Sequence, residues 1–268
     1  MSDITVTFVG NATMLIAAGE VTLLTDPNFL HQGQHAYLGY GLISKRRRQP
    51  ALTIEKLPAI DAVVLSHMHG DHWDRVAQRG LDHQLPVLTT PEAAKRLRRR
   101  GFGQAEGMAT WQTHMIAKGD MTVTVTSLPG RHAPIPLDRL LPPVMGSMLE
   151  FATADGAVRR MYLSGDTVLI EELNEIPLRF ASVDVGALHL GGTRLPAGAK
   201  LPFGLTVTMD ARQGAQAVEV LKLPKMIPVH FDDYGVFASS LADFKEEMKR
   251  RGLADRIVEL ERGGSVTV

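Results

Sequence analysis

Four side chains that can bind a metal ion are crowded into the six residues His67-Met68-His69-Gly70-Asp71-His72. His67 and His69 are two positions apart, a spacing that lets an extended or turning backbone point both rings to one side. Gly70 permits a sharp bend, and an aspartate and a third histidine follow it. Neutral imidazoles and a carboxylate suit zinc, manganese or iron. Without a cation these groups would repel and desolvate one another, so the cluster predicts a metal site.

Further candidate ligands stand at the ends of three other predicted strands, each directly after an apolar run. They are His132, Asp166 and His230. Six consecutive residues cannot easily surround one tetrahedral ion with four ligands, so division between two adjacent ions is geometrically simpler. A lone histidine at a strand end is more often a hydrogen-bonded structural residue, and this alternative applies to His132 and His230 taken singly.

The elements that must position these residues are strands in the first half of the chain and alternating helices and strands in the second. This order predicts sheets covered by helices in a layered α/β sandwich. No composition shift marks a linker, so we expect one domain over residues 1–268, with a long loop or lid insertion at about 28–58. The strands are expected at 4–9, 14–18, 21–25, 61–66, 86–89, 110–116, 121–127, 148–153, 159–163, 183–188, 225–229, 257–260 and 265–268, and the helices at 91–101, 169–179, 210–221 and 240–251.

The composition excludes several classes of function. The 268 residues carry 29 basic and 29 acidic side chains, so no global field recruits nucleic acid or an anionic membrane. The absence of cysteine excludes disulfides, Cys-ligated zinc and a thiol nucleophile. There is no signal peptide pattern and no run of about 20 apolar residues. We therefore expect a cytoplasmic protein that acts on a small-molecule substrate, without nucleic acid or a membrane segment, and a homo-oligomer is possible.

The spacing of these residues resembles the metallo-β-lactamase superfamily, whose signature is His-x-His-x-Asp-His. Three other segments are similar to its branch of L-ascorbate-6-phosphate lactonases and N-acyl-phosphatidylethanolamine-specific phospholipase D. They are 8–13, 24–27 and 165–167, and residues 60–67 lead into the signature. The resemblance implies a four-layer αββα sandwich with metals at the sheet edge.

The same resemblance implies a dinuclear site. His67, His69 and His132 would hold one metal, Asp71, His72 and His230 would hold the other, and Asp166 would bridge them. An aspartate at 166, where the antibiotic-degrading enzymes use a cysteine, implies that β-lactamase activity is at most weak. Two divalent ions are expected, zinc first, with manganese or iron as alternatives.

A pair of metals predicts hydrolysis by a bridging hydroxide, with a lactone or a phosphodiester as substrate. Asp71 could steer the hydroxide. Asp26 is a plausible acceptor for a ligand histidine N–H, and a cap on the Pro27 turn is an equally plausible role for it. His189 ends a predicted strand as the ligands do, and is a candidate proton donor or substrate contact. The alternative class is a nonhydrolytic metal protein, either an iron redox enzyme or a metal-dependent binding module.

Outside the ligands, the sequence leaves several roles open. Arg131 and Arg194 flank the presumed site, as do Asp232 and Tyr234. Residues 45–48, which include Arg46, could bind phosphate, but a solvated loop is the more ordinary interpretation of such a charge run. Tyr37, Leu38 and Tyr40 could form an apolar lid or a dimer contact.

Overall fold

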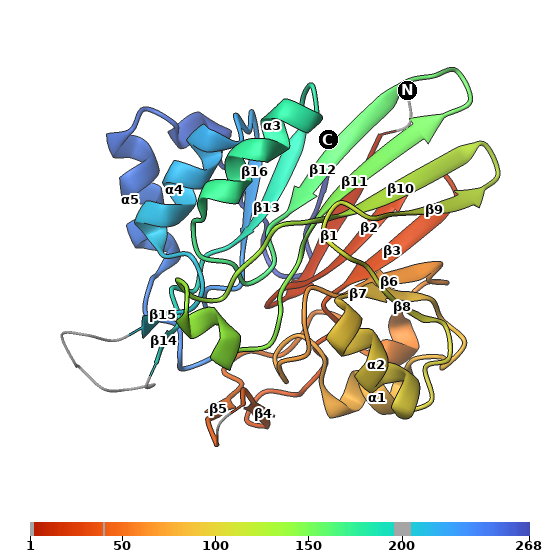
Figure 1. Cartoon of the computed structure of the whole chain (residues 1–268), viewed down its shortest axis with the longest axis horizontal. Helices are drawn as coiled ribbons and strands as arrows, with labels where there is room; N and C mark the ends of the chain where they lie inside the picture. The colour runs from red at the N-terminus through yellow and green to blue at the C-terminus, as the bar shows by residue number, and fades with distance from the viewer. Residues whose placement is uncertain (1–2, 40, 196–204) are drawn as a thin grey trace.

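Two β-sheets packed face to face form the centre of the molecule (Figure 1). The computed structural model describes residues 3–39, 41–195 and 205–268, so Tyr40 of the expected lid lies outside the described residues. One sheet has seven strands in the order β17-β1-β2-β3-β6-β7-β8, and the other has six in the order β16-β13-β12-β11-β10-β9. The first sheet comprises β1 (Thr5–Gly10), β2 (Thr13–Ala18), β3 (Val21–Thr25), β6 (Ala62–Val64), β7 (Val87–Thr89), β8 (Ala105–Gly107) and β17 (Ser265–Thr267). The second comprises β9 (Thr113–Lys118), β10 (Met121–Leu128), β11 (Gly146–Thr153), β12 (Val158–Leu163), β13 (Val185–His189) and β16 (Met226–Val229).

Helices cover the outer face of each sheet (Figure 1). The first sheet carries α1 (Arg75–Gly80) and α2 (Pro91–Arg99). The second carries α3 (Ile176–Arg179), α4 (Ala211–Val220) and α5 (Leu241–Arg250). One apolar cluster fills the space between the sheets, and two others lie under the helices. The predicted αββα sandwich is therefore confirmed, and within the described residues no helix is long and apolar enough to span a bilayer.

Parallel pairing explains why side chains far apart in sequence meet at one edge. The pairs β3·β6, β12·β13 and β13·β16 are parallel. Parallel strands end on the same side of their sheet, and ligands gather at such carboxyl ends. The segments that follow these strands are therefore brought together.

Local signals determine several helix boundaries as expected. Thr90 caps α2, with Pro91 at its first turn, and Asp210 caps α4. Ser240 and Asp243 form a reciprocal capping box on α5. These side chains accept hydrogen bonds from N–H groups that have no partner within the helix, which is why the boundaries follow from sequence.

Three expectations were wrong in detail. Residues 257–260 do not form a strand, since only Ile257 bridges to Met226, after a 3₁₀ turn η4 (Ala254–Arg256). The helix expected at 169–179 is a 3₁₀ turn η3 (Glu171–Glu175) followed by the four residues of α3, because Pro177 lacks the N–H that a continuing helix requires. The helix α1 was not predicted, because six residues show no clear periodicity; Asp74 caps it through Val76 N and Ala77 N.

The segment 28–58 contains short elements of its own. A hairpin is formed by β4 (His35–Tyr37) and β5 (Ile43–Lys45), and a 3₁₀ turn η1 (Ile54–Lys56) follows. A second small pair is formed by β14 (Arg194–Leu195) and β15 (Leu205–Thr206), and the 3₁₀ turn η2 (Leu137–Leu140) follows β10. Both small sheets and η2 lie at the same end of the molecule (Figure 1).

Candidate metal centre

All seven side chains predicted as ligands come together at the carboxyl ends of the strands. His67 follows β6, Asp166 follows β12 and His230 follows β16. They form two adjoining groups, each with potential ligand atoms within 4.8 Å of one another. The first group is His67, His69 and His132, and the second is His72, Asp166, His189 and His230. Asp71 lies beside the second group, with Oδ2 3.2 Å from His230 Nε2.

Backbone contacts explain the tight turn that carries the cluster. Gly70 N donates to Tyr37 O over 2.9 Å, and a Cβ at this position would lie 2.6 Å from that oxygen. Only glycine therefore allows the turn to pass so close to the β4–β5 hairpin. Asn11 ties the turn to the end of β16, because its Nδ2 donates to Asp71 O and its carbonyl accepts from His230 N.

The first group consists only of imidazoles. His67 Nε2 is 2.9 Å from His69 Nδ1, and Ser66 Oγ is 3.0 Å from His67 Nδ1. His132 Nδ1 lies 3.1 Å from Val207 O, so this nitrogen donates and the lone pair is left on Nε2. Burial and the neighbouring His72, His132 and His69 hold the pKa of His67 well below its ordinary value.

The same cause acts on its two partners. Burial, reinforced by His132, lowers the pKa of His69 to about 3. Burial also lowers the pKa of His132. All three rings are therefore neutral at pH 7, the form in which an imidazole binds a metal.

Three carboxylates surround His72 in the second group: Asp166, which belongs to it, and Asp71 and Asp26, which lie beside it. His72 Nε2 is 3.2 Å from Asp166 Oδ2 and 3.1 Å from His230 Nε2. Burial opposes a charge on His72, but the carboxylates of Asp166, Asp71 and Asp26 outweigh it and hold the pKa of His72 well above its ordinary value. Burial likewise opposes ionisation of Asp166, yet His230 and His72 keep its pKa well below the usual range. In the absence of a cation, a proton on His72 balances these carboxylates.

The donor set fits divalent ions. Four buried polar atoms that face these groups have no hydrogen-bond partner: His69 Nε2, His132 Nε2, Asp71 Oδ1 and His230 Nδ1. Buried polar atoms normally have a hydrogen-bond partner, so four such atoms without one in the same place require an explanation. Nitrogen and carboxylate ligands in two adjoining groups are the set that zinc, manganese or iron takes.

Asp26 supports this centre from behind, as expected. Its Oδ2 is 3.2 Å from His72 Nδ1, and its Oδ1 accepts from Ser66 N over 2.7 Å. Asp26 thereby orients the ring of His72 and holds the strand end that leads into the cluster.

His189 contacts Asp166 and does not line the pocket that opens beside the two groups. Its Nδ1 is 2.9 Å from Asp166 Oδ1, and its backbone N donates to Ser164 Oγ. Burial lowers the pKa of His189 despite the contact with Asp166. Its side chain is absent from the described lining of the pocket beside the centre, so its position favours orienting Asp166 over touching a substrate.

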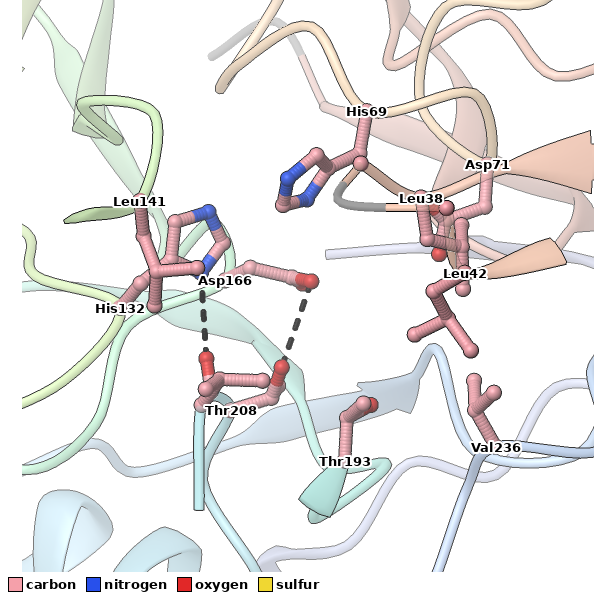
Figure 2. A pocket seen from close by; sticks show the side chains of 13 residues that line it. Leu38, Leu42, His69, Asp71, His132, Leu141, Asp166, Thr193, Thr208 and Val236 are labelled. Atoms are coloured by element: carbon pink, nitrogen blue, oxygen red, sulfur yellow. Dashed lines mark hydrogen bonds between the residues drawn. The ribbon is translucent and has the colours of Figure 1, made fainter. Parts of the chain in front are cut away.

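A pocket of about 410 Å³ opens next to the two groups (Figure 2). From the centre, His69, Asp71, His132 and Asp166 reach it. The rest of its described lining is small or apolar: Leu38, Gly39, Gly41, Leu42, Leu141, Thr193, Val207, Thr208 and Val236. The centre therefore faces a confined space that can hold a small molecule.

The arginines singled out in the sequence do not line this pocket. Arg46 is fully buried and pairs with Asp233 over 3.2 Å, so the expectation of a solvated loop was wrong for this residue. A buried guanidinium needs a partner, and carboxylate and carbonyl oxygens supply it here. Arg131 is bound to Glu172 and lies 3.8 Å from Asp138, and Arg194 is exposed.

Two further residues of the site were not found from sequence. Thr208 Oγ1 donates to Asp166 Oδ2 over 3.3 Å at the pocket wall (Figure 2). Asn11 joins Asp71 and His230 through its amide and carbonyl. Asn11 has a positive φ, a conformation that glycine and asparagine tolerate best. The Gly10-Asn11 pair in the sequence is consistent with such a turn, but it does not predict which residues Asn11 contacts.

Known proteins share this sequence pattern and fold. A protein of Deinococcus radiodurans named a metal-dependent hydrolase is 26% identical over 238 residues, covering 86% of this chain and 92% of its own. N-acyl-phosphatidylethanolamine-hydrolyzing phospholipase D 1 of Caenorhabditis elegans is 28% identical over 201 residues, covering 71% of this chain and 54% of its own. The crystal structure of an isothiocyanate hydrolase from Delia radicum gut bacteria has a similar fold, with a TM-score of 0.79, 21% identity and 98% coverage of both chains. The sequence profile of the β-lactamase superfamily domain matches residues 22–231, which is most of the chain, and the chain therefore belongs to the β-lactamase superfamily.

Proposed function

We propose that the protein is a dinuclear metal-dependent hydrolase that cleaves a small ester-type bond. One observation carries the proposal: two adjoining groups of buried or half-buried potential ligands, in which four polar atoms lack a hydrogen-bond partner, border one pocket. The names of the relatives, a metal-dependent hydrolase and a phospholipase D, support the same class of reaction.

The ligands divide between two sites. His67, His69 and His132 would hold one ion, Asp71, His72 and His230 would hold the other, and Asp166 would be shared. Asp166 suits that role because it contacts His72 of the second group, its charge also acts on the imidazoles of the first group, and it reaches the pocket. When bound, two divalent ions lower the pKa of water and polarise the scissile bond. Zinc is our first candidate, with manganese or iron as alternatives.

The protein's own side chains supply orientation and proton handling. Asp71 lines the pocket, with one carboxylate oxygen against His230 and the other without a hydrogen-bond partner. That free oxygen can orient a water molecule or accept its proton. Burial opposes ionisation of Asp71, yet His72 and His230 keep its pKa below the usual range, so it is ionised at neutral pH. His189 and Thr208 hold Asp166 in place from two sides.

Metal analysis together with turnover tests the proposal. Protein purified without chelators should contain about two equivalents of divalent metal per chain and should hydrolyse a lactone or a phosphodiester. His67→Ala should lower both the metal content and the turnover, while His114→Ala, which changes a histidine on β9 outside the centre, should lower neither. One equivalent or less in the unsubstituted protein would contradict the dinuclear centre. Two equivalents without turnover of any ester would favour the nonhydrolytic alternative.

A further inference from the structure

The guanidinium of Arg46 is fully buried, although Arg46 is neither a proposed ligand nor among the described residues that line the pocket. It directly follows β5, in the hairpin that forms part of the pocket wall. Its Nη1 donates to Asn28 O over 2.7 Å and to Asn28 Oδ1 over 2.6 Å, and its Nη2 donates to Asp233 Oδ1 over 3.2 Å. Because a guanidinium is planar and its N–H groups point in fixed directions, it holds these acceptors at a fixed separation.

One branch of contacts runs through Asn28 to the turn that carries the histidine cluster. Both Arg46 and the hydroxyl of Tyr234 donate to Asn28 Oδ1, so the oxygen end of this amide faces them. The nitrogen end therefore faces the other way, and Nδ2 donates to Gly70 O over 3.3 Å and to Asp74 Oδ2 over 3.0 Å. Arg46 thus determines which end of the amide meets the turn.

The other branch runs through Asp233 to the end of β16. Asp233 Oδ2 accepts from Asn11 N over 2.7 Å. Asn11 in turn donates from Nδ2 to Asp71 O over 2.7 Å and accepts from His230 N over 2.9 Å. Asn11 therefore holds the backbones of two proposed ligands of the same ion, and the carboxylate that holds Asn11 is paired with Arg46.

The backbone at the end of this second branch is strained. His230 has a φ of 60° and Asn11 has a φ of 55°, both in the left-handed region. A histidine stays in this conformation only where its surroundings hold it there. The hydrogen bond from His230 N to Asn11 O, supported by Asp233, is such a constraint. It keeps the ring of His230 beside Asp71, at 3.2 Å.

The imidazole group is held mainly by other contacts. Ser66 Oγ lies 3.0 Å from His67 Nδ1, and His132 Nδ1 lies 3.1 Å from Val207 O. Of the three histidines in this group, only His69 is next to a residue that the branches reach, through the carbonyl of Gly70. The two branches therefore act more on the second group than on the first.

We propose that Arg46 is a positioning residue for the ion that Asp71, His72 and His230 would hold, which we call the second ion. Its two branches fix the histidine turn and the end of β16 relative to each other, so that the ligands of this ion meet at the right separation. Arg46 acts on the backbone that carries the ligands and makes no described hydrogen bond to a ligand side chain. The inference rests on the proposed dinuclear centre and assigns a role within it.

Titration of the metal-free protein with zinc tests the role. Arg46→Met keeps a long unbranched side chain but removes every donor. We expect the affinity for the second ion to fall by about tenfold or more, as for residues that orient a ligand, and the affinity for the ion of the imidazole group to fall less. Anomalous X-ray scattering then shows which of the two sites keeps its zinc. Arg160→Met removes an arginine from a partly buried ion pair with Glu150 in the second sheet, and this control should leave both affinities unchanged.

Two milder variants keep the test decisive if Arg46→Met does not fold. Arg46→Lys retains the charge but has a single nitrogen, so it cannot hold both Asn28 and Asp233 and should restore the affinity only in part. Asn11→Gly tolerates the positive φ and removes the amide that donates to Asp71 O. Since both changes act on one path, the double variant should lose less affinity for the second ion than the product of the two single losses.

Hydrogen exchange in the metal-free protein separates this inference from the proposed function. In Arg46→Met, amides of residues 68–74 and 226–232 should exchange faster by about tenfold or more, and in Arg160→Met they should not. Equal weakening of both ions, or an unchanged affinity for the second ion, would overturn the inference even if two ions bind. Binding of one ion by the unsubstituted protein would contradict the dinuclear centre, whereas faster exchange in both segments would still support the positioning of these two strand ends.

Discussion

The two groups of the candidate metal centre lie at the same end of the two sheets but differ in charge. His67, His69 and His132 are neutral imidazoles, because burial together with mutual repulsion lowers their pKa values. Around His72, carboxylates reverse the effect of burial, and the pKa of this histidine is raised. The first group therefore offers lone pairs without releasing a proton, whereas the second must lose a proton to take a metal. Metal binding by the second group should depend more strongly on pH.

The largest expected effect comes from Asp166, which contacts three histidines of the second group and also reaches the pocket. Asp166→Asn keeps the shape but removes the charge that the second group shares with the pocket. We expect kcat/KM to fall by more than about 100-fold, the upper end of the range for residues that merely orient a ligand, and metal content to fall below two equivalents. Asp155→Asn, in the exposed β11–β12 turn, is the matched control. Metal content and activity equal to those of the control would remove Asp166 from the centre.

The sequence was informative where a site residue follows a strand that can itself be predicted from an apolar run. Apolar runs predicted the central strands, and a histidine or aspartate directly after such a run predicted the members of both groups. It failed where a contact depends on residues distant in sequence. Arg46 looked solvated because nothing near it in the chain reveals Asp233, 187 residues away. Short elements without a full period, such as α1, escaped for a related reason: too few positions establish a pattern.

The opposite pKa shifts within the centre also escaped prediction. A histidine in an apolar strand end and a histidine among carboxylates look alike in a sequence. Part of the difference arises from Asp26, which directly follows β3 and is distant from His72 along the chain. It becomes a partner of His72 only through the parallel pairing of β3 and β6, which brings the two strand ends side by side.

An intermediate effect on metal affinity is expected from a change at Asp26. Its carboxylate contacts histidines of the second group and none of the first group. Asp26→Asn should weaken the ion held by Asp71, His72 and His230 by about 10- to 100-fold, because His72 loses the carboxylate that orients its ring. The ion held by the imidazole group should be affected less. Stepwise chelator titration followed by metal analysis measures both affinities. Equal weakening of the two ions would show that the groups do not act separately.

The smallest effects concern the pH dependence of stability in the metal-free protein. In the unfolded chain each histidine titrates near its ordinary value of 6.5. The folded protein keeps the imidazole group neutral below that pH, so the unfolded chain binds more protons and the free energy of unfolding falls on acidification. The raised pKa of His72 has the opposite sign: the folded protein retains a proton that the unfolded chain releases, and stability falls as the pH rises above 6.5.

Thermal unfolding of two single variants separates the loss of stability at acidic pH from the loss at alkaline pH, which we call the acidic and alkaline arms of the profile. His69→Gln should reduce the loss of Tm between pH 7 and pH 5, and His72→Gln should reduce the loss between pH 7 and pH 9. Each change should amount to a few degrees, since about 1 kcal/mol shifts Tm by about 2–4 °C in a chain of this size. The pair is its own control, because each variant should leave the other arm in place. If His69→Gln altered the alkaline arm instead, the two groups would be one coupled cluster, and the contrast between neutral and charge-balanced ligands would not hold.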